Sequence, residues 1–305
     1  MLNFVLLALV GLAAQLVDGS LGMAYGVTST TLLLAIGTNP AMASATVHLA
    51  EIGTTLASGI SHHRFGNVDW QVVLRIGVPG AIGAFAGATF LSRISTEAAA
   101  PLMAIILLVL GAYVLVRFTF FGISTRKLGQ RLPTKFLAPL GLFAGFVDAT
   151  GGGGWGPVGT PALLASGHME PRKVIGTIDA SEFLIAIAAS VGFFVGLGGG
   201  AIVPWMAGAL LLGGLIAAPI AAWLVRHLPP RVLGAAAGAT IVLVNARSLV
   251  RSLGMPEGLQ LPAYLLAFAL GAAAVGWSLR AHLRARRVDQ SRVDDDVAEG
   301  DAVPA

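Results

Sequence analysis

The stretch Asp148–Pro157, DATGGGGWGP, places four consecutive glycines between a carboxylate and a Trp-Gly-Pro sequence. It interrupts an apolar segment, residues 135–166, that exceeds the ~20 residues needed to cross a bilayer. The arm after the glycines has about ten residues and, at ~1.5 Å per residue, spans about half of the hydrocarbon core. The interruption therefore predicts a discontinuous helix or a re-entrant hairpin.

A second interruption near the N-terminus repeats the first one. Residues 11–37, GLAAQLVDGSLGMAYGVTSTTLLLAIG, align with residues 141–167, GLFAGFVDATGGGGWGPVGTPALLASG, so that Asp18 meets Asp148. From Pro40 onward the offset between the copies is 131 residues instead of 130. With this offset, Pro40, Thr46 and Glu51 align with Pro171, Thr177 and Glu182. The chain is interpreted as two membrane repeats, 1–125 and 126–255, a final transmembrane helix at 256–283 and a tail at 284–305.

The composition places the chain among integral membrane proteins. Of its 305 residues, 56% are hydrophobic and 11% are charged, whereas soluble domains have about 25% charged residues. The absence of cysteine excludes disulfides and thiolate metal sites. The net charge of +4, with basic residues in a few loops and the tail, does not indicate a nucleic-acid partner. The apolar N-terminus lacks a basic leader and is interpreted as the first membrane helix and not as a removable signal.

Basic loops predict the topology. Apolar segments of membrane length lie at 41–62, 70–92, 98–121, 172–196, 201–226, 231–250 and 262–283. The basic loop 122–135 and the residues after Arg280 should both be cytoplasmic, which requires that 135–166 return to its own side. Each repeat is then one broken or re-entrant helix plus three crossings, an odd number, so the second repeat is inverted. Such inverted repeats are typical of secondary transporters. The tail 284–305 is charged and is predicted to be disordered and cytoplasmic, with its basic part at the lipid surface.

The aspartates and glycines at the breaks are the leading candidates for a binding site. A carboxylate at membrane depth is a functional candidate, although Asp18 and Asp148 could also cap the half-helices that follow. Backbone N–H groups of a glycine nest at a helix N-terminus can bind an anion; alternatively the glycines allow close helix packing. Trp155 and Tyr25 are expected to gate the pocket or to anchor packing. The predicted substrate-binding residues are Asp18, Ser20, Gly22, Tyr25, Thr28, Asp148, Thr150, Gly151, Gly152, Gly153, Gly154, Trp155 and Thr160.

A second matched group lies on the helices that follow the breaks. TVHLAE at 46–51 parallels TIDASE at 177–182, and each places two polar residues one helical turn apart on the same face. These side chains could carry protons or form interhelical hydrogen bonds. Because Asp179 replaces His48, a metal site is not predicted, and no cofactor is expected. The coupling candidates are Thr46, His48, Glu51, Thr177, Asp179 and Glu182.

Over roughly residues 1–250, these features resemble the sulfite exporter TauE/SafE family of membrane permeases. The resemblance rests on GLAAQLVDGSLGMAYGVTSTTLLL, its copy GLFAGFVDATGGGGWGPVGTPALL and the helices that follow each. It implies passage of small sulfur-containing anions, often as export across the bacterial cytoplasmic membrane, with Gly151–Gly154 and Gly19–Gly26 in the substrate site. The first copy has fewer glycines, so the two halves of the site should be chemically unequal.

The sequence is therefore predicted to encode an all-α secondary transporter, not an enzyme, that exports sulfite or an organosulfonate across the inner membrane by alternating access. No Walker motif is present, so an ion or substrate gradient should drive transport. The alternatives are an intramembrane aspartyl protease and a cation or metal permease. Proton coupling is a possibility, and the glycine face at 77–88 could serve internal packing or a homodimer. Val at Gly152 or Gly153 is expected to abolish anion binding and to leave the protein folded.

Overall fold

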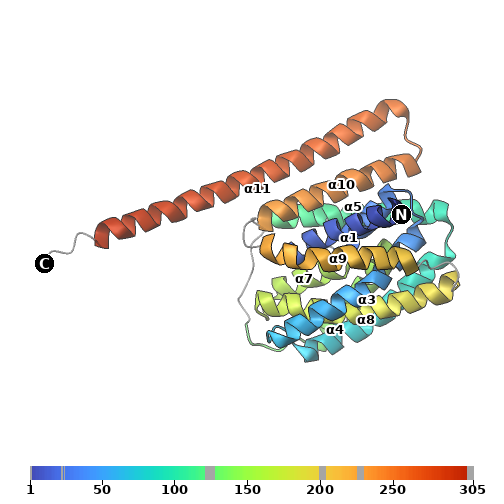
Figure 1. Cartoon of the computed structure of the whole chain (residues 1–305), viewed down its shortest axis with the longest axis horizontal. Helices are drawn as coiled ribbons and strands as arrows, with labels where there is room; N and C mark the ends of the chain where they lie inside the picture. The colour runs from blue at the N-terminus through green and yellow to red at the C-terminus, as the bar shows by residue number, and fades with distance from the viewer. Residues whose placement is uncertain are drawn as a thin grey trace.

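The computed structural model describes the backbone of residues 2–21, 23, 25–120, 128–198, 204–224 and 230–300, and all regular elements in these ranges are α-helices (Figure 1). The same order of short and long helices occurs twice. The first series is α1 (Leu2–Leu21), α2 (Tyr25–Ala35), α3 (Pro40–Arg64), α4 (Trp70–Arg93) and α5 (Thr96–Phe120). The second is α6 (Thr134–Gly151), α7 (Trp155–Ser166), α8 (Pro171–Leu197), α9 (Pro204–Leu224) and α10 (Pro230–Ser252), followed by α11 (Glu257–Gly300). The predicted all-α membrane fold is confirmed.

Both predicted interruptions are real breaks between helices. The helices after the breaks, α2 and α7, have 11 and 12 residues, which is ~16–18 Å of helix, about half of a bilayer core. In the second break Gly152 has φ 69° and Gly153 has φ 147°. Side chains with a Cβ rarely adopt these conformations, so these two glycines let α6 end and the chain turn.

The segment α6–α7 begins and ends at the same end of the bundle. The N–H of Gly129, before α6, donates to the carbonyl of His168, after α7, at 3.2 Å. Figure 1 shows the N-terminus and the α10–α11 connection at one end of the bundle, and residues 128–133 at the opposite end. The two broken helices therefore start from opposite ends of the bundle.

Each broken helix packs against a helix of the other series: α4 lies along α6, and α9 lies along α1. Glycines make these contacts close. A Cβ added at Gly145 would overlap the carbonyl of Gly80, and one added at Gly11 would overlap the carbonyl of Leu210. Small residues of this kind let helix backbones touch inside a membrane. Because Gly80 also packs against the ring of Trp155, the glycine face at 77–88 serves packing within the chain.

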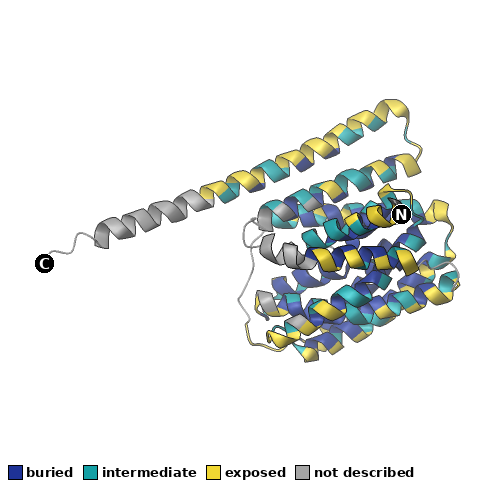
Figure 2. Cartoon of the chain, in the orientation of Figure 1, coloured by how far each residue is buried: buried dark blue, intermediate teal, exposed yellow. Residues whose placement is uncertain are grey.

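The outer faces of the helices are suited to lipid. Within the described residues, four helical segments are long and apolar enough to cross a membrane: Trp70–Arg93, Thr96–Phe120, Lys173–Leu197 and Glu257–Arg284. Exposed residues run along the outside of the bundle and along α11 (Figure 2), and many of them are large and apolar, such as Leu74, Ile82 and Val109. The protein is therefore a multi-pass membrane protein.

The last helix extends further than predicted. α11 continues to Gly300, whereas the sequence led us to expect a disordered tail over 284–305; residues 301–305 lie outside the described part. The charge-based prediction of disorder overlooked that residues 284–299 contain neither Gly nor Pro. Without a Gly or Pro, the sequence contains no residue that would end the membrane helix at this point.

Candidate transport site

Both aspartates at the breaks cap the half-helix that follows. The Asp18 carboxylate accepts a hydrogen bond from the backbone N–H of Tyr25 at 3.0 Å, and the Asp148 carboxylate accepts one from Trp155 at 2.9 Å. A carboxylate in this position satisfies a free N–H and is stabilised by the helix dipole. The equivalent bonds in the two halves show that the capping interpretation of the two aspartates is structurally correct, and each cap fixes the start of α2 or α7.

Asp148 also forms a buried pair with His48 of α3. Its second oxygen lies 2.9 Å from His48 Nε2, and His48 Nδ1 lies 2.8 Å from the carbonyl of Ser44. Nδ1 must donate to that carbonyl, and a proton must also lie between Nε2 and the carboxylate. The pair therefore holds one proton more than a neutral imidazole beside a carboxylate, and its net charge is zero. Because the side chains of His48 and Asp148 are only 1% and 2% exposed, this neutrality removes most of the cost of burying charge.

The equivalent position in the second half carries a carboxylate. Asp179 of α8, the counterpart of His48, accepts a hydrogen bond from Ser58 Oγ at 2.6 Å and lies 3.4 Å from His62 Nε2. Both partners belong to α3, the helix that also carries His48. The two halves of the site are thus chemically unequal, with an imidazole on one side and a carboxylate on the other.

Further carboxyl groups surround the breaks. Glu51 is 2% exposed, and its Oε1 has no hydrogen-bond partner within the described residues. Glu182 lies within electrostatic reach of Glu51, Asp148, Asp179 and Asp18. Like charges that share a buried site do not all ionise. In this carboxyl cluster (Asp18, Glu51, Asp148, Asp179 and Glu182), Glu51 and Glu182 are the members with neither a histidine partner nor a capping bond among the described residues and are the candidates to hold a proton.

Several predicted hydroxyl groups are buried without a partner. Within the described part of the chain, no hydrogen bond reaches the side-chain oxygen of Tyr25, Thr28, Thr150 or Thr160. These residues lie at the breaks or on the half-helices α2 and α7. Because buried polar groups in folded proteins almost always have partners, each of these hydroxyls is available to bind a polar ligand.

The four glycines do not form the predicted anion nest as a group, because two of their N–H groups are used in backbone hydrogen bonds. The N–H groups of Gly152 and Gly153 both bond to the Asp148 carbonyl, and Gly151 is the last residue of α6. A Cβ on Gly153 would overlap the backbone of Gly26 and Val27 in the other break. At this break, only the N–H groups of Gly154 and Gly156 lack a bond among the described contacts. The expectation that Val at Gly152 or Gly153 leaves the protein folded is therefore wrong, because both positions need φ values and space that Val lacks.

Other predicted site residues have structural roles. Trp155 is fully buried, and its indole N–H lies 3.2 Å from both the Ile178 carbonyl and Ser181 Oγ, so it anchors α7 on α8. Thr177 accepts a bond from the N–H of Asp69 at 3.0 Å and thereby joins α8 to the start of α4. Thr46 is buried in α3. Gly22 and the side chain of Ser20 lie outside the described residues.

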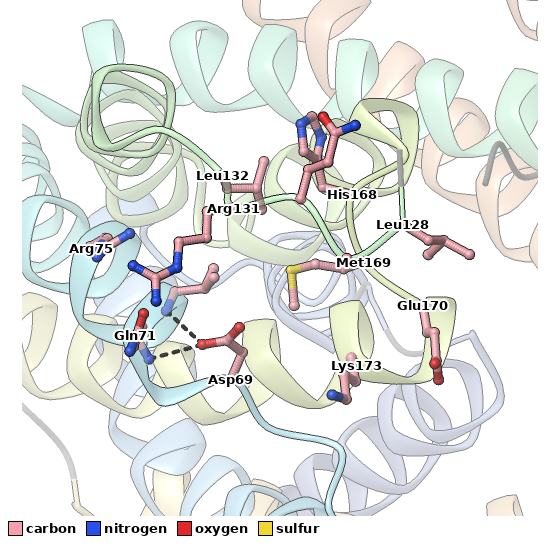
Figure 3. A pocket seen from close by; sticks show the side chains of 13 residues that line it. Asp69, Gln71, Arg75, Leu128, Arg131, Leu132, His168, Met169, Glu170 and Lys173 are labelled. Carbon is pink, nitrogen blue, oxygen red and sulfur yellow. Dashed lines mark hydrogen bonds between the residues drawn. The ribbon is translucent and has the colours of Figure 1, made fainter. Parts of the chain in front are cut away.

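A polar pocket of about 300 Å³ lies at the end of the bundle where α4, α6 and α8 begin (Figure 3). Arg75, Arg131 and Lys173 line it, and none of the three forms an ion pair with another described residue. One wall is fixed by Asp69, whose carboxylate accepts bonds from the N–H groups of Gln71 and Val72. Arg131 and Lys173 lie in basic segments that predicted the topology, whereas their convergence with Arg75 was not predicted.

Two serines of α3 that support the site were not predicted from the sequence. Ser44 donates to the carbonyl of Ala149 at 2.7 Å, and Ser58 binds Asp179. A signal was available, because Ser44 precedes His48, and Ser58 precedes His62, by one helical turn.

Comparisons with known proteins identify the family of the chain. The family model described as "Sulfite exporter TauE/SafE" matches residues 7–248. The "Probable membrane transporter protein YtnM" of Bacillus subtilis (strain 168) is 54% identical over 251 residues, covering 82% of this chain and 84% of that protein. A "Probable membrane transporter protein" of Haemophilus influenzae is 26% identical over 218 residues, covering 67% of this chain and 79% of its own length. No solved structure matches the chain. The chain belongs to the sulfite exporter TauE/SafE family and is a membrane transporter.

Proposed function

We propose that the protein is a secondary transporter that exports a small oxyanion, sulfite or an organosulfonate, by alternating access around the two breaks in the cytoplasmic membrane. The observation that carries the proposal is the group of unpartnered buried hydroxyls on Tyr25, Thr28, Thr150 and Thr160. Together with the free N–H groups of Gly154 and Gly156, at the positive end of α7, they offer hydrogen bonds to the oxygens of an anion.

The carboxyl cluster implies that protons accompany the anion. An anion that enters beside several ionised carboxylates is repelled, and the repulsion is strong where water is scarce. Protonation of Glu51 or Glu182 removes that charge and turns the carboxyl into a hydrogen-bond donor. Anion binding and proton binding should therefore support each other, which is the basis of coupled transport.

The pocket at the end of the bundle favours an anion over a cation. Arg75, Arg131 and Lys173 outnumber the acidic lining residues Asp69 and Glu170, so the pocket attracts anions more than metal ions. Within the described residues, no three His, Asp or Glu side chains converge as metal ligands. These features argue against a cation or metal permease.

The geometry of the aspartates argues against an aspartyl protease. Such an enzyme needs two carboxyl groups that share a proton and activate a water molecule. In this protein both oxygens of Asp148 are engaged, one by the N–H of Trp155 and the other by His48. Asp18 uses one oxygen to cap α2.

The test is titration calorimetry of the purified protein with sulfite, sulfoacetate, taurine and divalent metal ions. We expect sulfite or sulfoacetate to bind and the double variant Thr150→Val with Thr160→Val to weaken binding about a hundredfold or more, since each lost hydrogen bond to a charged group is worth ~1.5–3 kcal/mol. Thr240→Val, on the exposed side of α10, is the matched control. Binding of metal ions alone would overturn the assignment.

A further inference from the structure

We infer that the polar pocket where α4, α6 and α8 begin is a binding site for one compact oxyanion, a ligand with a phosphate, sulfate or sulfonate group. The inference goes beyond the proposed function, because this pocket is separate from the breaks. It lies at the start of α6, and the break lies at the end of that helix. The 18 residues of α6 span ~27 Å, so one small anion cannot contact both places.

The pocket is lined by three cationic side chains that come from three different segments. Arg75 lies in the second turn of α4, Arg131 precedes α6, and Lys173 lies in the first turn of α8. In the part of the chain that the structure describes, none of them forms an ion pair or a side-chain hydrogen bond. The positive-inside rule accounts for basic residues at one end of a membrane protein, but it does not require three of them to line one cavity. Their convergence favours a ligand with negative charge.

The two carboxylates of the pocket do not neutralise these cations. Asp69 caps α4 and accepts bonds from two N–H groups of its first turn at 3.0 and 3.2 Å, so the positive end of that helix balances part of its charge. Glu170 is exposed and lies, in the view of Figure 3, beyond Lys173 from the two arginines. Neither carboxylate forms an ion pair with any of the three cations, so the donors of the cations remain available to a ligand.

The first turn of α8 adds backbone donors to the pocket. Its N-cap residue, Glu170, makes no hydrogen bond from its side chain to that turn, and Pro171 occupies the start of the helix. The first turn of α4, by contrast, is capped by Asp69. The N–H groups that follow Pro171 are therefore open to a ligand, and the positive end of a helix favours an anion there.

Hydrogen bonds hold the walls of the pocket together. The N–H of Gly129 donates to the carbonyl of His168 at 3.2 Å, which joins the segment before α6 to the link between α7 and α8. The N–H of Asp69 donates to Thr177 Oγ1 at 3.0 Å, which joins the start of α4 to α8. Because the walls are already in place, less free energy is lost to ordering when a ligand binds.

The size of the pocket and its donors define the ligand. Its volume of about 300 Å³ is at the lower end for small-molecule sites, which limits the ligand to a compact anion. Two of the three cations are arginines, and a guanidinium group pairs with two oxygens of a phosphate, sulfate or sulfonate group at once. A tetrahedral oxyanion has enough oxygens to accept bonds from all three side chains.

The duplicated sequence does not repeat the cations of this site. In the order of helices, α9 is the counterpart of α4, and with the offset of 131 residues 36–42 are the counterpart of residues 167–173. Neither α9 nor residues 36–42 contain a charged residue, and Lys173 corresponds to Met42. The ligand therefore binds from one side of the membrane only, where it ties the first turns of α4 and α8 to the segment before α6.

The test is titration calorimetry of the purified full chain in detergent with sodium phosphate and sodium sulfate as probes, at an ionic strength held constant with sodium chloride. We expect at least one of the two anions to bind, and Arg75→Gln and Lys173→Gln each to weaken binding about tenfold or more, the scale of losing a hydrogen bond to a charged group. The melting temperatures should not change, because neither side chain has a partner among the described residues. Arg93→Gln, which removes an exposed arginine at the other end of α4, is the matched control and should bind like the wild type.

Two further arms locate the ligand and its source. Thr150→Val with Thr160→Val alters the breaks and should leave binding to the pocket unchanged. To test a lipid headgroup as the source of the phosphate group, the melting temperature is measured in mixed micelles with phosphatidylglycerol and with phosphatidylcholine. A higher melting temperature with phosphatidylglycerol, lost in Arg75→Gln and Lys173→Gln, would assign the oxyanion to a lipid. Binding of the free anion that the same two variants weaken would assign it to a soluble ligand.

The outcomes separate this site from the transport site. The pocket would be overturned as a site by no response of the wild type to phosphate, sulfate or phosphatidylglycerol, by equal responses of the wild type and both variants, or by an equal loss in Arg93→Gln. Loss of anion binding in the Thr150→Val with Thr160→Val protein alone would place the anion at the breaks and would also overturn it. A protein that binds phosphate at the pocket but neither sulfite nor sulfoacetate would contradict the proposed function and leave this inference standing.

Discussion

The buried His48–Asp148 pair makes an asymmetric prediction about stability. His48→Leu leaves the Asp148 carboxylate buried without its partner, and breaking a buried ion pair in this way costs about 3–5 kcal/mol. Asp148→Asn is different, because the amide can still accept from the Trp155 N–H and can donate to Nε2 of a neutral His48. The pair stays neutral and hydrogen-bonded, so the cost should be about 1 kcal/mol or less.

In the double variant, the effect of Asp148→Asn on the free energy of unfolding should have the opposite sign to its effect in the wild type. In the His48→Leu background, Asp148→Asn removes the uncompensated charge and leaves one buried amide without a partner, which costs only about 1–3 kcal/mol. The second substitution should therefore stabilise the His48→Leu protein by about 2 kcal/mol, although it slightly destabilises the wild type. At about 2–4 °C per kcal/mol, the melting temperature should fall by about 6 °C or more in the single variant and recover in part in the double variant.

The assay is thermal unfolding of purified protein in one detergent, followed by intrinsic fluorescence. Asp18→Asn is the matched control: Asp18 caps α2 in the same way but forms no ion pair with a described residue. If Asp148→Asn destabilises the His48→Leu protein as well, the pair does not hold the extra proton and the charge argument fails.

Three further predictions follow from other features of the site. Gly153→Ala should lower stability by about 2–6 kcal/mol through strain and overlap with the facing break, whereas Gly154→Ala, with an extended φ of 174°, should cost about 1 kcal/mol; equal melting temperatures for the two variants would contradict the packing. Arg75→Gln with Arg131→Gln should raise the KM for sulfoacetate several-fold at low salt and have little effect at ~1 M salt, where charges are screened; a loss that does not depend on salt would argue against electrostatic attraction. Tyr25→Phe should weaken sulfoacetate binding about tenfold without lowering the melting temperature, since its hydroxyl is unpartnered, and a large drop in melting temperature would place that hydroxyl in the fold instead.

The breaks and their capping aspartates could be predicted because their signals are local. Four glycines after a carboxylate, and a second copy of the pattern 130 residues earlier, are visible in the sequence itself. The length of the half-helices also follows from the apolar run between Trp155 and Ser166. These features need no knowledge of which helices touch.

The partners across the bundle could not be predicted, because they depend on which helices meet. Nothing in the residues around His48 says that its imidazole reaches Asp148, 100 residues away. Likewise, the contact of Gly153 with Gly26 is a property of two facing backbones. The anion nest was overestimated for the same reason: the N–H groups of Gly152 and Gly153 are used to end α6, which the sequence alone does not reveal.

The crossed packing of the two series has a consequence for biogenesis. Because α1 lies along α9 and α6 lies along α4, the first half cannot complete its own interior. During synthesis, the glycine surface of α1 around Gly11 has no packing partner in the membrane until α9 has been made. α4, by contrast, meets its partner as soon as α6 is made. A chain truncated after α5 should therefore be retained by membrane quality control, since helices with unsatisfied glycine faces associate with any available neighbour.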